Sequence, residues 1–182
     1  MRKLVVTTFL SLDGVMENPA WSAPYWNDEI AAFKGEETDG SDALLLGRVT
    51  YEGFAAAWPN RTGVDSGADY FNSVRKYVAT NTLDKAEWTN SVILRGDGLK
   101  AEIEKLKQQD GTNITVHGSG RLVRWLMDND LVDVYRLLVY PVVLGKGQRL
   151  FEDGAMATLK LVESRPVGSG VIGLIYQPAR DA

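Results

Sequence analysis

Short apolar runs alternate with segments of helical periodicity along most of this chain, and this alternation constrains the fold more than any other feature. The run at 43–46 is apolar at every position, which is typical of a strand buried on both faces of a sheet. Leu122, Trp125 and Leu126 lie three and four residues apart and predict a helix with one apolar face. Strands and helices that alternate in this way predict a parallel sheet with helices on both faces.

The same patterns set the expected elements along the chain. The predicted strands span residues 4–10, 43–46, 77–80, 91–94, 113–117 and 132–143, and the predicted helices span 26–34, 50–57, 99–109 and 121–127. Two further β-rich runs, 159–165 and 171–177, flank a glycine-containing turn and predict a C-terminal antiparallel hairpin. The sequence has no repeat, low-complexity tract or linker, so we expect one domain over residues 1–182.

Composition excludes several classes of function. The chain has no cysteine and one histidine, which removes thiolate chemistry and Cys- or His-rich metal sites, so we expect no metal. Its net charge of −4 argues against a broad nucleic-acid-binding face but allows a local basic pocket for one phosphate. No run approaches the roughly 18 apolar residues of a membrane span. The start of the chain fits a buried strand better than a signal peptide, so we expect a cytoplasmic protein without nucleic-acid or membrane partners.

A first glycine turn follows the apolar run at 43–46, where Gly47 and Arg48 precede a predicted helix. Glycine lets the backbone approach a ligand closely, and the N–H groups at a helix N-terminus favour a phosphate. Arg48 can add a bidentate contact, and Thr50 can cap the helix or donate its hydroxyl to the same phosphate. The same residues also fit an ordinary strand–helix turn in which Arg48 is solvated and Thr50 only caps.

A second glycine turn, Gly118-Ser119-Gly120, follows the predicted strand 113–117 and precedes Arg121. Two glycines around a serine at the start of a helix favour an anion-binding nest, although they also fit a tight turn that lets helix and strand pack closely. A standard dinucleotide fingerprint would place a third glycine at position 123, which is Val123.

The two glycine turns are more informative together than separately. Parallel strands end at the same edge of a sheet, where ligands of open α/β folds bind, so both turns are expected at one crevice. There they can hold the two ends of one dinucleotide, and Thr80 and Asn81, after another strand, can supply a third polar contact.

Carboxylates are the candidates for acid–base chemistry. Asp13 lies in the loop after the first strand, and Glu29 stands beside Asp28 at the start of the helix 26–34, close to three aromatic residues. Apolar surroundings raise the pKa of a carboxyl group and let it donate a proton. Asp28 and Glu29 also fit a simpler role, in which they complement the helix N-terminus. We name Asp13 and Glu29 as candidate catalytic residues.

Three other residues allow competing interpretations. A lone histidine on a strand, as His117 is, is more often structural than catalytic. Serine hydrolysis by Ser119 with His117 is compatible with the residue counts, but the Gly-x-Ser-x-Gly elbow is absent and the two residues are poorly placed to pair. Lys146 lies in a glycine-rich loop that fits either a plain loop or a basic pocket for a phosphorylated substrate.

Four motifs occur in order along the chain: Ser11-Leu12-Asp13-Gly14, Gly47-Arg48-x-Thr50, Gly118-Ser119-Gly120-Arg121 and Pro141-Val142-Val143-Leu144-Gly145-x-Gly147. Their order and spacing resemble the dihydrofolate-reductase-like superfamily, and more closely its RibD C-terminal family, the reductase domain of riboflavin biosynthesis, in its stand-alone bacterial form. The resemblance covers nearly the whole chain. It implies a three-layer α/β fold with a mostly parallel, eight-stranded mixed sheet flanked by helices.

The resemblance also implies NADPH as the cofactor. The first glycine turn is then expected at the adenosine 2′-phosphate, the second at the pyrophosphate, and the loop after the first strand over the nicotinamide. With Thr80 and Asn81, the expected cofactor-binding residues are Val15, Met16, Gly47, Arg48, Thr50, Thr80, Asn81, Gly118, Ser119, Gly120, Arg121 and Leu122. Dihydrofolate reductases place an acid on the first helix after a Trp and a Pro; Trp21, Pro24 and Asp28 or Glu29 are similar at a longer spacing.

The resulting hypothesis is an NADPH-dependent reductase that transfers hydride to a small heterocycle. The substrate class is a pterin-like compound or a riboflavin precursor, as in 5-amino-6-(5-phosphoribosylamino)uracil reductases, and family resemblance implies a homodimer. The alternative is a non-catalytic nucleotide- or ligand-binding module on the same fold, which has kept the cofactor cleft and lost the acid.

Overall fold

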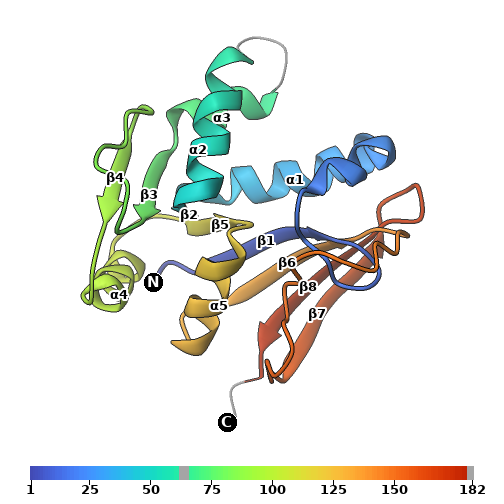
Figure 1. Ribbon diagram of the computed structural model, residues 1–182. Helices are drawn as coiled ribbons and strands as arrows, with labels where there is room; N and C mark the ends of the chain where they lie inside the picture. The colour runs from blue at the N-terminus through green and yellow to red at the C-terminus, as the bar shows by residue number, and fades with distance from the viewer. Residues whose placement is uncertain (62–65, 180–182) are drawn as a thin grey trace.

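A single twisted sheet organises the chain, as the computed structural model of residues 1–61 and 66–179 shows (Figure 1). The described strands lie in the order β4-β3-β2-β5-β1-β6-β8-β7. Pairs from β4 through β6 are parallel, whereas β8 pairs antiparallel with both β6 and β7. The strands are β1 (Leu4–Leu10), β2 (Ser41–Gly47), β3 (Arg75–Ala79), β4 (Ser91–Leu94), β5 (Asn113–His117), β6 (Val134–Val139), β7 (Leu159–Pro166) and β8 (Ile172–Pro178).

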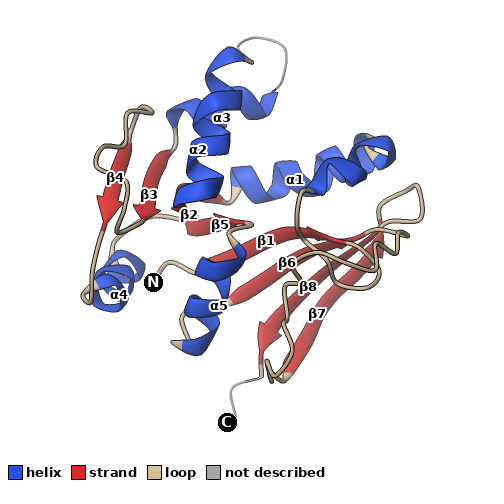
Figure 2. Ribbon diagram, viewed as in Figure 1, coloured by secondary structure: helices blue, strands red, loops and turns tan. Residues whose placement is uncertain are grey.

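Helices cover both faces of the sheet, which makes three layers (Figure 2). On one face lie α1 (Asp28–Asp39), α2 (Arg48–Ala57) and α3 (Ser66–Ser73), and on the other lie α4 (Leu99–Gln108) and α5 (Gly120–Asp128). Two short 3₁₀ helices, η1 (Pro19–Tyr25) and η2 (Trp58–Asn60), precede α1 and follow α2.

The central strand β2 shows why its run is apolar at every position. Side chains alternate between the two faces of a strand. Leu44 packs with Tyr51 and Phe71 of α2 and α3, whereas Leu45 belongs to the cluster that contains Leu126 of α5. Both faces of β2 are therefore buried, as the sequence predicted.

The expected fold class is confirmed: a mostly parallel sheet flanked by helices, with an antiparallel C-terminal hairpin. Most predicted boundaries differ from the observed ones by one or two residues, and the differences are larger for two elements. The predicted strand 132–143 narrows to β6, because Pro141 has no N–H to donate and Val142 N turns back to Tyr140 O at 2.8 Å. The predicted helix 26–34 begins two residues later, where Asn27 accepts a hydrogen bond from Ile30 N, and it continues to Asp39.

Leu126 tests how strongly α5 depends on the core. Its side chain is fully buried between α5 and the sheet, so Leu126→Ala should lower the free energy of unfolding by about 2–5 kcal/mol. Urea unfolding followed by circular dichroism measures the change. The matched control is Leu12→Ala, because Leu12 is 66% exposed and its truncation should cost less than about 0.5 kcal/mol. Equal effects of the two substitutions would contradict this packing.

Candidate functional site

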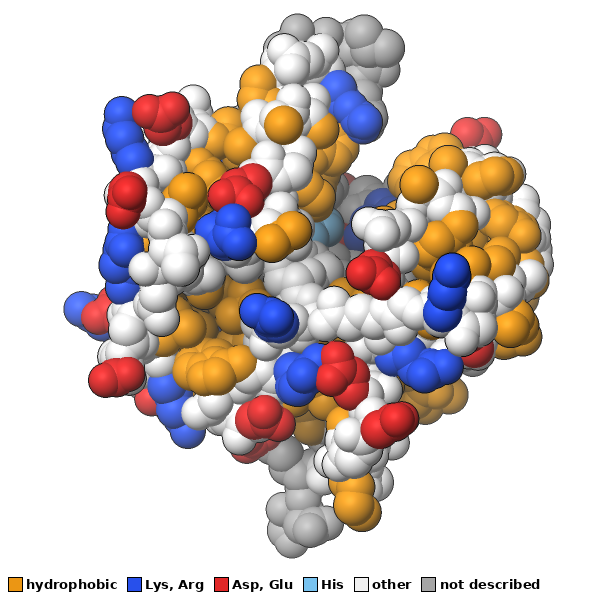
Figure 3. Space-filling view, viewed as in Figure 1, with side chains coloured by type: hydrophobic (Ala, Val, Ile, Leu, Met, Phe, Trp, Pro, Cys, Tyr) orange, Lys and Arg blue, Asp and Glu red, His pale blue; other side chains and the backbone are white. Residues whose placement is uncertain are grey.

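A cleft of about 2260 Å³ opens at the carboxyl ends of the central parallel strands. It runs from the glycine turns after β2 and β5 to the space between α1 and α2, and Figure 3 shows the surface hollowed there, with histidine at depth. Drug-sized ligands occupy pockets of roughly 300–1,000 Å³. The cleft therefore has room for a dinucleotide and a second small molecule.

Ser119 joins the two glycine turns directly. Its Oγ accepts a hydrogen bond from Gly47 N at 3.0 Å and donates to Thr50 Oγ1 at 2.7 Å. A Cβ at position 47 would lie only 3.0 Å from Ser119 Oγ, so a residue with a side chain would displace this contact. Gly118 and Ser119 both have positive φ (52° and 62°), and the two peptides curl at the start of α5. The two turns form one structure rather than two independent loops.

The helices that begin at these turns leave their first N–H groups without side-chain caps. Neither the N-terminus of α2 nor that of α5 has a side-chain cap hydrogen bond, although Thr50 lies within the first turn of α2. Thr50 instead accepts from Ser119. Uncapped N–H groups and the helix dipole favour an anion. Arg48 and Arg121 are exposed at this part of the cleft, and Arg48 pairs with Glu52 at 3.0 Å.

Eleven of the twelve residues expected to bind a cofactor line the cleft. They are Met16, Gly47, Arg48, Thr50, Thr80, Asn81, Gly118, Ser119, Gly120, Arg121 and Leu122. The twelfth residue, Val15, is buried and does not line the cleft. Its Cγ1 lies so close to Gly147 that a Cβ at position 147 would clash with it. Thr80 and Asn81 also shape their own turn, because Thr80 Oγ1 accepts from Leu83 N and Asn81 Oδ1 accepts from Gly96 N.

The loop after β1 is held by Asp13. Its carboxylate accepts from Leu144 N at 3.1 Å and Gly145 N at 2.8 Å, and Ser11 Oγ donates to it at 2.6 Å. These hydrogen bonds, that of Ser11 first, lower the pKa of Asp13 to about 2. At neutral pH Asp13 is therefore an ionised clamp between two loops.

The two carboxylates predicted as catalytic do not line the cleft. Glu29 is exposed on the first turn of α1, and Asp13 is committed to backbone N–H groups of the neighbouring loop. Lys146 is likewise exposed and outside the cleft. The catalytic roles of Asp13 and Glu29 stay predictions, and the cleft offers other ionisable groups.

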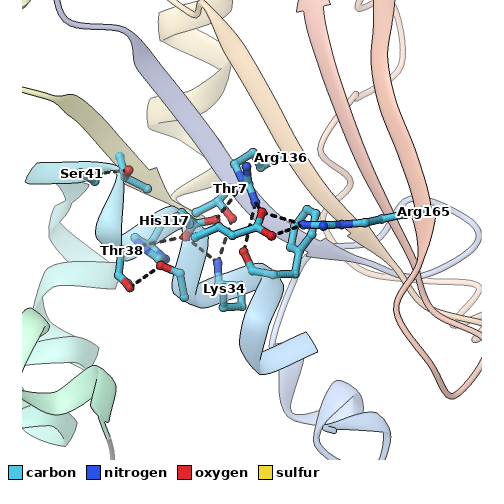
Figure 4. Close-up of polar contacts among 12 residues, drawn as sticks. Thr7, Lys34, Thr38, Ser41, His117, Arg136 and Arg165 are labelled. Atoms are coloured by element: carbon cyan, nitrogen blue, oxygen red, sulfur yellow. Dashed lines mark hydrogen bonds and ion pairs between the residues drawn. The ribbon is translucent and has the colours of Figure 1, made fainter. Parts of the chain in front are cut away.

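Two of those groups, Lys34 and His117, line the half of the cleft between α1 and α2, to which the sequence analysis assigned no binding residues. Lys34 of α1 donates from Nζ to Thr7 Oγ1 at 2.9 Å and to Glu37 Oε1 at 2.6 Å (Figure 4). His117 ends β5 directly beside Thr7, its register partner on β1, and its Nε2 lies 3.5 Å from Glu37 Oε1. Three elements, α1, β1 and β5, thus bring an ammonium, a carboxylate and an imidazole together.

Burial and charge set the protonation of this cluster. Burial, and then the charge of Lys34, lowers the pKa of His117 to about 4, against the opposing pull of Glu37. Burial raises the pKa of Glu37, but the interactions with its neighbours, that with Lys34 first, together outweigh burial, and the net pKa lies below the usual carboxyl range. At neutral pH the cluster therefore holds a neutral imidazole and an ion pair.

Aromatic rings surround the imidazole on the α2 side. The His117 ring lies 5.7 Å from Phe54 and 5.3 Å from Phe71, and Trp58 stacks on Phe71 with centroids 4.2 Å apart. All of these side chains line the cleft. Aromatic rings therefore form the wall of the cleft beside the imidazole, and Arg61 and Asp39 add charged groups to the lining.

Gln148 is a further cleft residue that the sequence did not single out. It comes from the glycine-rich loop 144–149, and its amide lies so close to Gly120 that a Cβ there would be 2.5 Å from Nε2. Gly120 is therefore required for this contact. The sequence feature that could have indicated Gln148 is the pair of glycines in its loop, Gly145 and Gly147.

The hydrolase interpretation of Ser119 finds no support in this geometry. The Ser119 hydroxyl donates to Thr50 and accepts from Gly47, so its proton points away from a general base. His117 lies 3.5 Å from a carboxylate, but its neighbours on the other side are aromatic rings. A nucleophile–base hydrogen bond between the two is not formed.

Fold and cleft together define a dihydrofolate-reductase-like α/β protein. The dihydrofolate reductase of Enterococcus faecalis, solved with NADP(H), superposes with a TM-score of 0.65 at 17% identity, covering 98% of this chain and 97% of that one. The chain belongs to the RibD C-terminal domain family, whose model matches residues 2–173.

The chain is similar in sequence to one bacterial protein and in fold to one solved reductase. The uncharacterized protein YwjB of Bacillus subtilis (strain 168) is 32% identical over 178 residues, covering 93% of this chain and 95% of its own length. The Thermotoga maritima diaminohydroxyphosphoribosylaminopyrimidine deaminase/5-amino-6-(5-phosphoribosylamino)uracil reductase has a TM-score of 0.69 at 16% identity, and the match covers 98% of this chain but 57% of that one.

No described helix is long and apolar enough to cross a membrane. Within residues 1–61 and 66–179, no group of three or more His, Asp or Glu side chains is arranged to hold a metal ion.

The protonation of His117 can be measured directly, because the chain has one histidine and hence one set of imidazole NMR signals. We expect a titration midpoint near pH 4 in the folded protein and near 6.5 in urea. Since the folded pKa is depressed, the neutral ring stabilises the fold above pH 6.5, and this stabilisation is lost as the pH falls through 4. The difference corresponds to about 3 kcal/mol. A folded-state midpoint near 6.5 would contradict the burial described above.

Proposed function

We propose that this protein is an NADPH-dependent reductase that acts on a pterin-like or riboflavin-precursor heterocycle. One observation carries the proposal: the two glycine turns are joined by Ser119 into one anion-binding edge, and that edge opens into the same cleft as the apolar pocket between α1 and α2. Family membership and the reductases among the structural neighbours support a reductase-type function.

The residues of the anion-binding edge fit the phosphates of a dinucleotide. The uncapped N-terminus of α5, with Gly118 and Gly120, would hold the pyrophosphate, because a Cβ at Gly118 meets no atom within 4 Å and the turn faces open space. Arg48, at the start of α2, would hold the 2′-phosphate that distinguishes NADPH from NADH. When bound, NADPH supplies the hydride, and the protein supplies orientation and a dry pocket.

The pocket between α1 and α2 would then receive the substrate. Its walls are the aromatic side chains of Phe54, Trp58 and Phe71, which suit a flat ring, and its polar groups are those of the Lys34 cluster. Placing the substrate here leaves it beside the second glycine turn, since His117 directly precedes Gly118. Water is excluded by the same apolar walls.

The proposal also covers the localisation and the oligomeric state of the protein. We propose that it acts in the cytoplasm, because the start of the chain fits a buried strand better than a signal peptide, and that it is a homodimer, as the family resemblance implies. The alternative on the same fold is a non-catalytic binding module, and it predicts ligand binding without oxidation of NADPH.

Arg48→Ala tests the cofactor half. Loss of a charge-assisted contact should weaken NADPH binding by roughly 10- to 100-fold and leave NADH binding almost unchanged, because NADH has no 2′-phosphate. Isothermal titration of the wild type and the variant with each nucleotide measures this. Arg149→Ala is the matched control, since Arg149 does not line the cleft and donates to Asp13 O. Equal losses for both nucleotides would count against the 2′-phosphate role, and no binding of either by the wild type would overturn the proposal.

A further inference from the structure

We propose that Lys34 is the residue that selects the substrate, by donating a hydrogen bond to a carbonyl or enolate oxygen on the ring bound between α1 and α2. The inference rests on the proposed function for the location of the substrate. It assigns a substrate class, namely heterocycles that present an oxygen acceptor to α1. Heterocycles that present amino donors to α1 would instead need a carboxylate there.

Lys34 is a cation with a fixed position and spare donor capacity. An ammonium group has three donors, and two of them are taken by Thr7 Oγ1 and Glu37 Oε1. The side chain is 17% exposed and lines the cleft. Two N–H groups of the ammonium donate to β1 and to α1, so the third N–H group can donate to a ligand. Because Glu37 and Thr7 already hold the ammonium, a substrate oxygen would gain a prepositioned partner.

The acid next to Lys34 cannot serve a donor-edged substrate. The side chain of Glu37 is 1% exposed, and one of its oxygens is already bonded to Lys34. It is also absent from the residues that line the cleft. A ring that presents amino and N–H donors would therefore lie against the Lys34 ammonium, which is also a donor, and no hydrogen bond would form between them.

Three other polar residues, His117, Thr38 and Asp39, do not replace Lys34 as the group that faces the ligand. His117 presents a ring packed against Phe54 and Phe71, and the Thr38 hydroxyl donates to Gly35 O within α1. Asp39 lines the cleft too, but it is exposed at the last residue of α1, where water screens its charge. In the apolar interior beside the aromatic rings, a hydrogen bond from Lys34 is stronger than one made in water.

The test uses two flat pteridines that differ in their substituents at C2 and C4: 2,4-dioxopteridine has carbonyl oxygens there, and 2,4-diaminopteridine has amino groups there. Each is titrated calorimetrically into the protein, with and without saturating NADP⁺. The wild type should bind the dioxo compound more tightly. Lys34→Met should weaken dioxo binding by roughly 10- to 100-fold and change diamino binding little.

Two more variants complete the design. Lys100→Met is the matched control, because Lys100 also lines the cleft but is exposed on α4, and dioxo binding should stay within about twofold of the wild type. Lys34→Met removes the cation 2.6 Å from the buried Glu37 and leaves Arg136 at 3.9 Å, so folding is checked by circular dichroism. The double variant Lys34→Glu/Glu37→Gln moves the carboxylate from the buried position 37 to position 34, whose side chain is 17% exposed and lines the cleft, and should invert the preference toward the diamino compound.

The outcomes separate this inference from the proposed function. A dioxo preference that survives Lys34→Met, or a double variant that keeps the wild-type preference, overturns the role of Lys34 even if NADPH binds. A preference that depends on Lys34 in a protein that binds no NADP⁺ supports Lys34 and overturns only the cofactor assignment. Equal binding of both pteridines by the wild type overturns the selectivity.

Discussion

The parallel pairing of β5 between β1 and β2 is the constraint on which the rest of the structure depends. It places Thr7 opposite His117 and brings the end of β2 beside the end of β5. Only in that arrangement can one side chain, Ser119, bond to the first glycine turn from the second. Since all three strands run in the same direction, their carboxyl ends lie at one edge, and both glycine turns open into one cleft.

A buried ion pair beside this edge is costly unless its groups are well bonded. Replacing a buried salt bridge by apolar side chains is often neutral or stabilising, so the pair is weak evidence for stability as such. Here the neighbouring residue Glu36 bonds to Arg136 and Arg165 at 3.1 and 2.6 Å, which ties the same turn of α1 to β6 and β7. Glu37 belongs to the same network, since Arg136 Nε lies 3.9 Å from its Oε2. The Lys34 ammonium therefore pairs with a buried acid, and under the inference above its third donor would also serve a ligand.

Much of the fold could be predicted from the sequence because its signals are local. Apolar runs, glycine turns and helical spacing predicted the sheet, four helices and nine of the cleft residues, and the family resemblance added Met16 and Leu122. The sequence did not predict α3, whose eight residues are too few to show a clear period. It also ended α1 too early, because the segment after Lys34 is polar and looks like a solvated loop.

The Lys34 cluster could not be predicted, since its contacts are not local. Lys34 meets Thr7 across 27 positions of sequence, and Glu37 is buried although its neighbours in the chain, Glu36 and Thr38, are polar. The contacts of Asp13 are also not local: the sequence places this carboxylate in a loop, but it does not show that backbone N–H groups more than 130 residues away bond to it. Residue type alone does not tell a proton donor from a clamp.

The cleft therefore combines two halves whose chemistry is set by different elements. Under the proposed function, the cofactor half would use backbone N–H groups at the starts of α2 and α5, which any sequence with the same turns would present. The substrate half would use side chains of α1 that face the sheet, so one substitution there would change the hydrogen-bonding groups offered to a ligand without disturbing the glycine turns. With an ammonium on α1 where a carboxylate would serve a donor-edged ring, the same cofactor edge would be combined with a substrate that presents an oxygen acceptor.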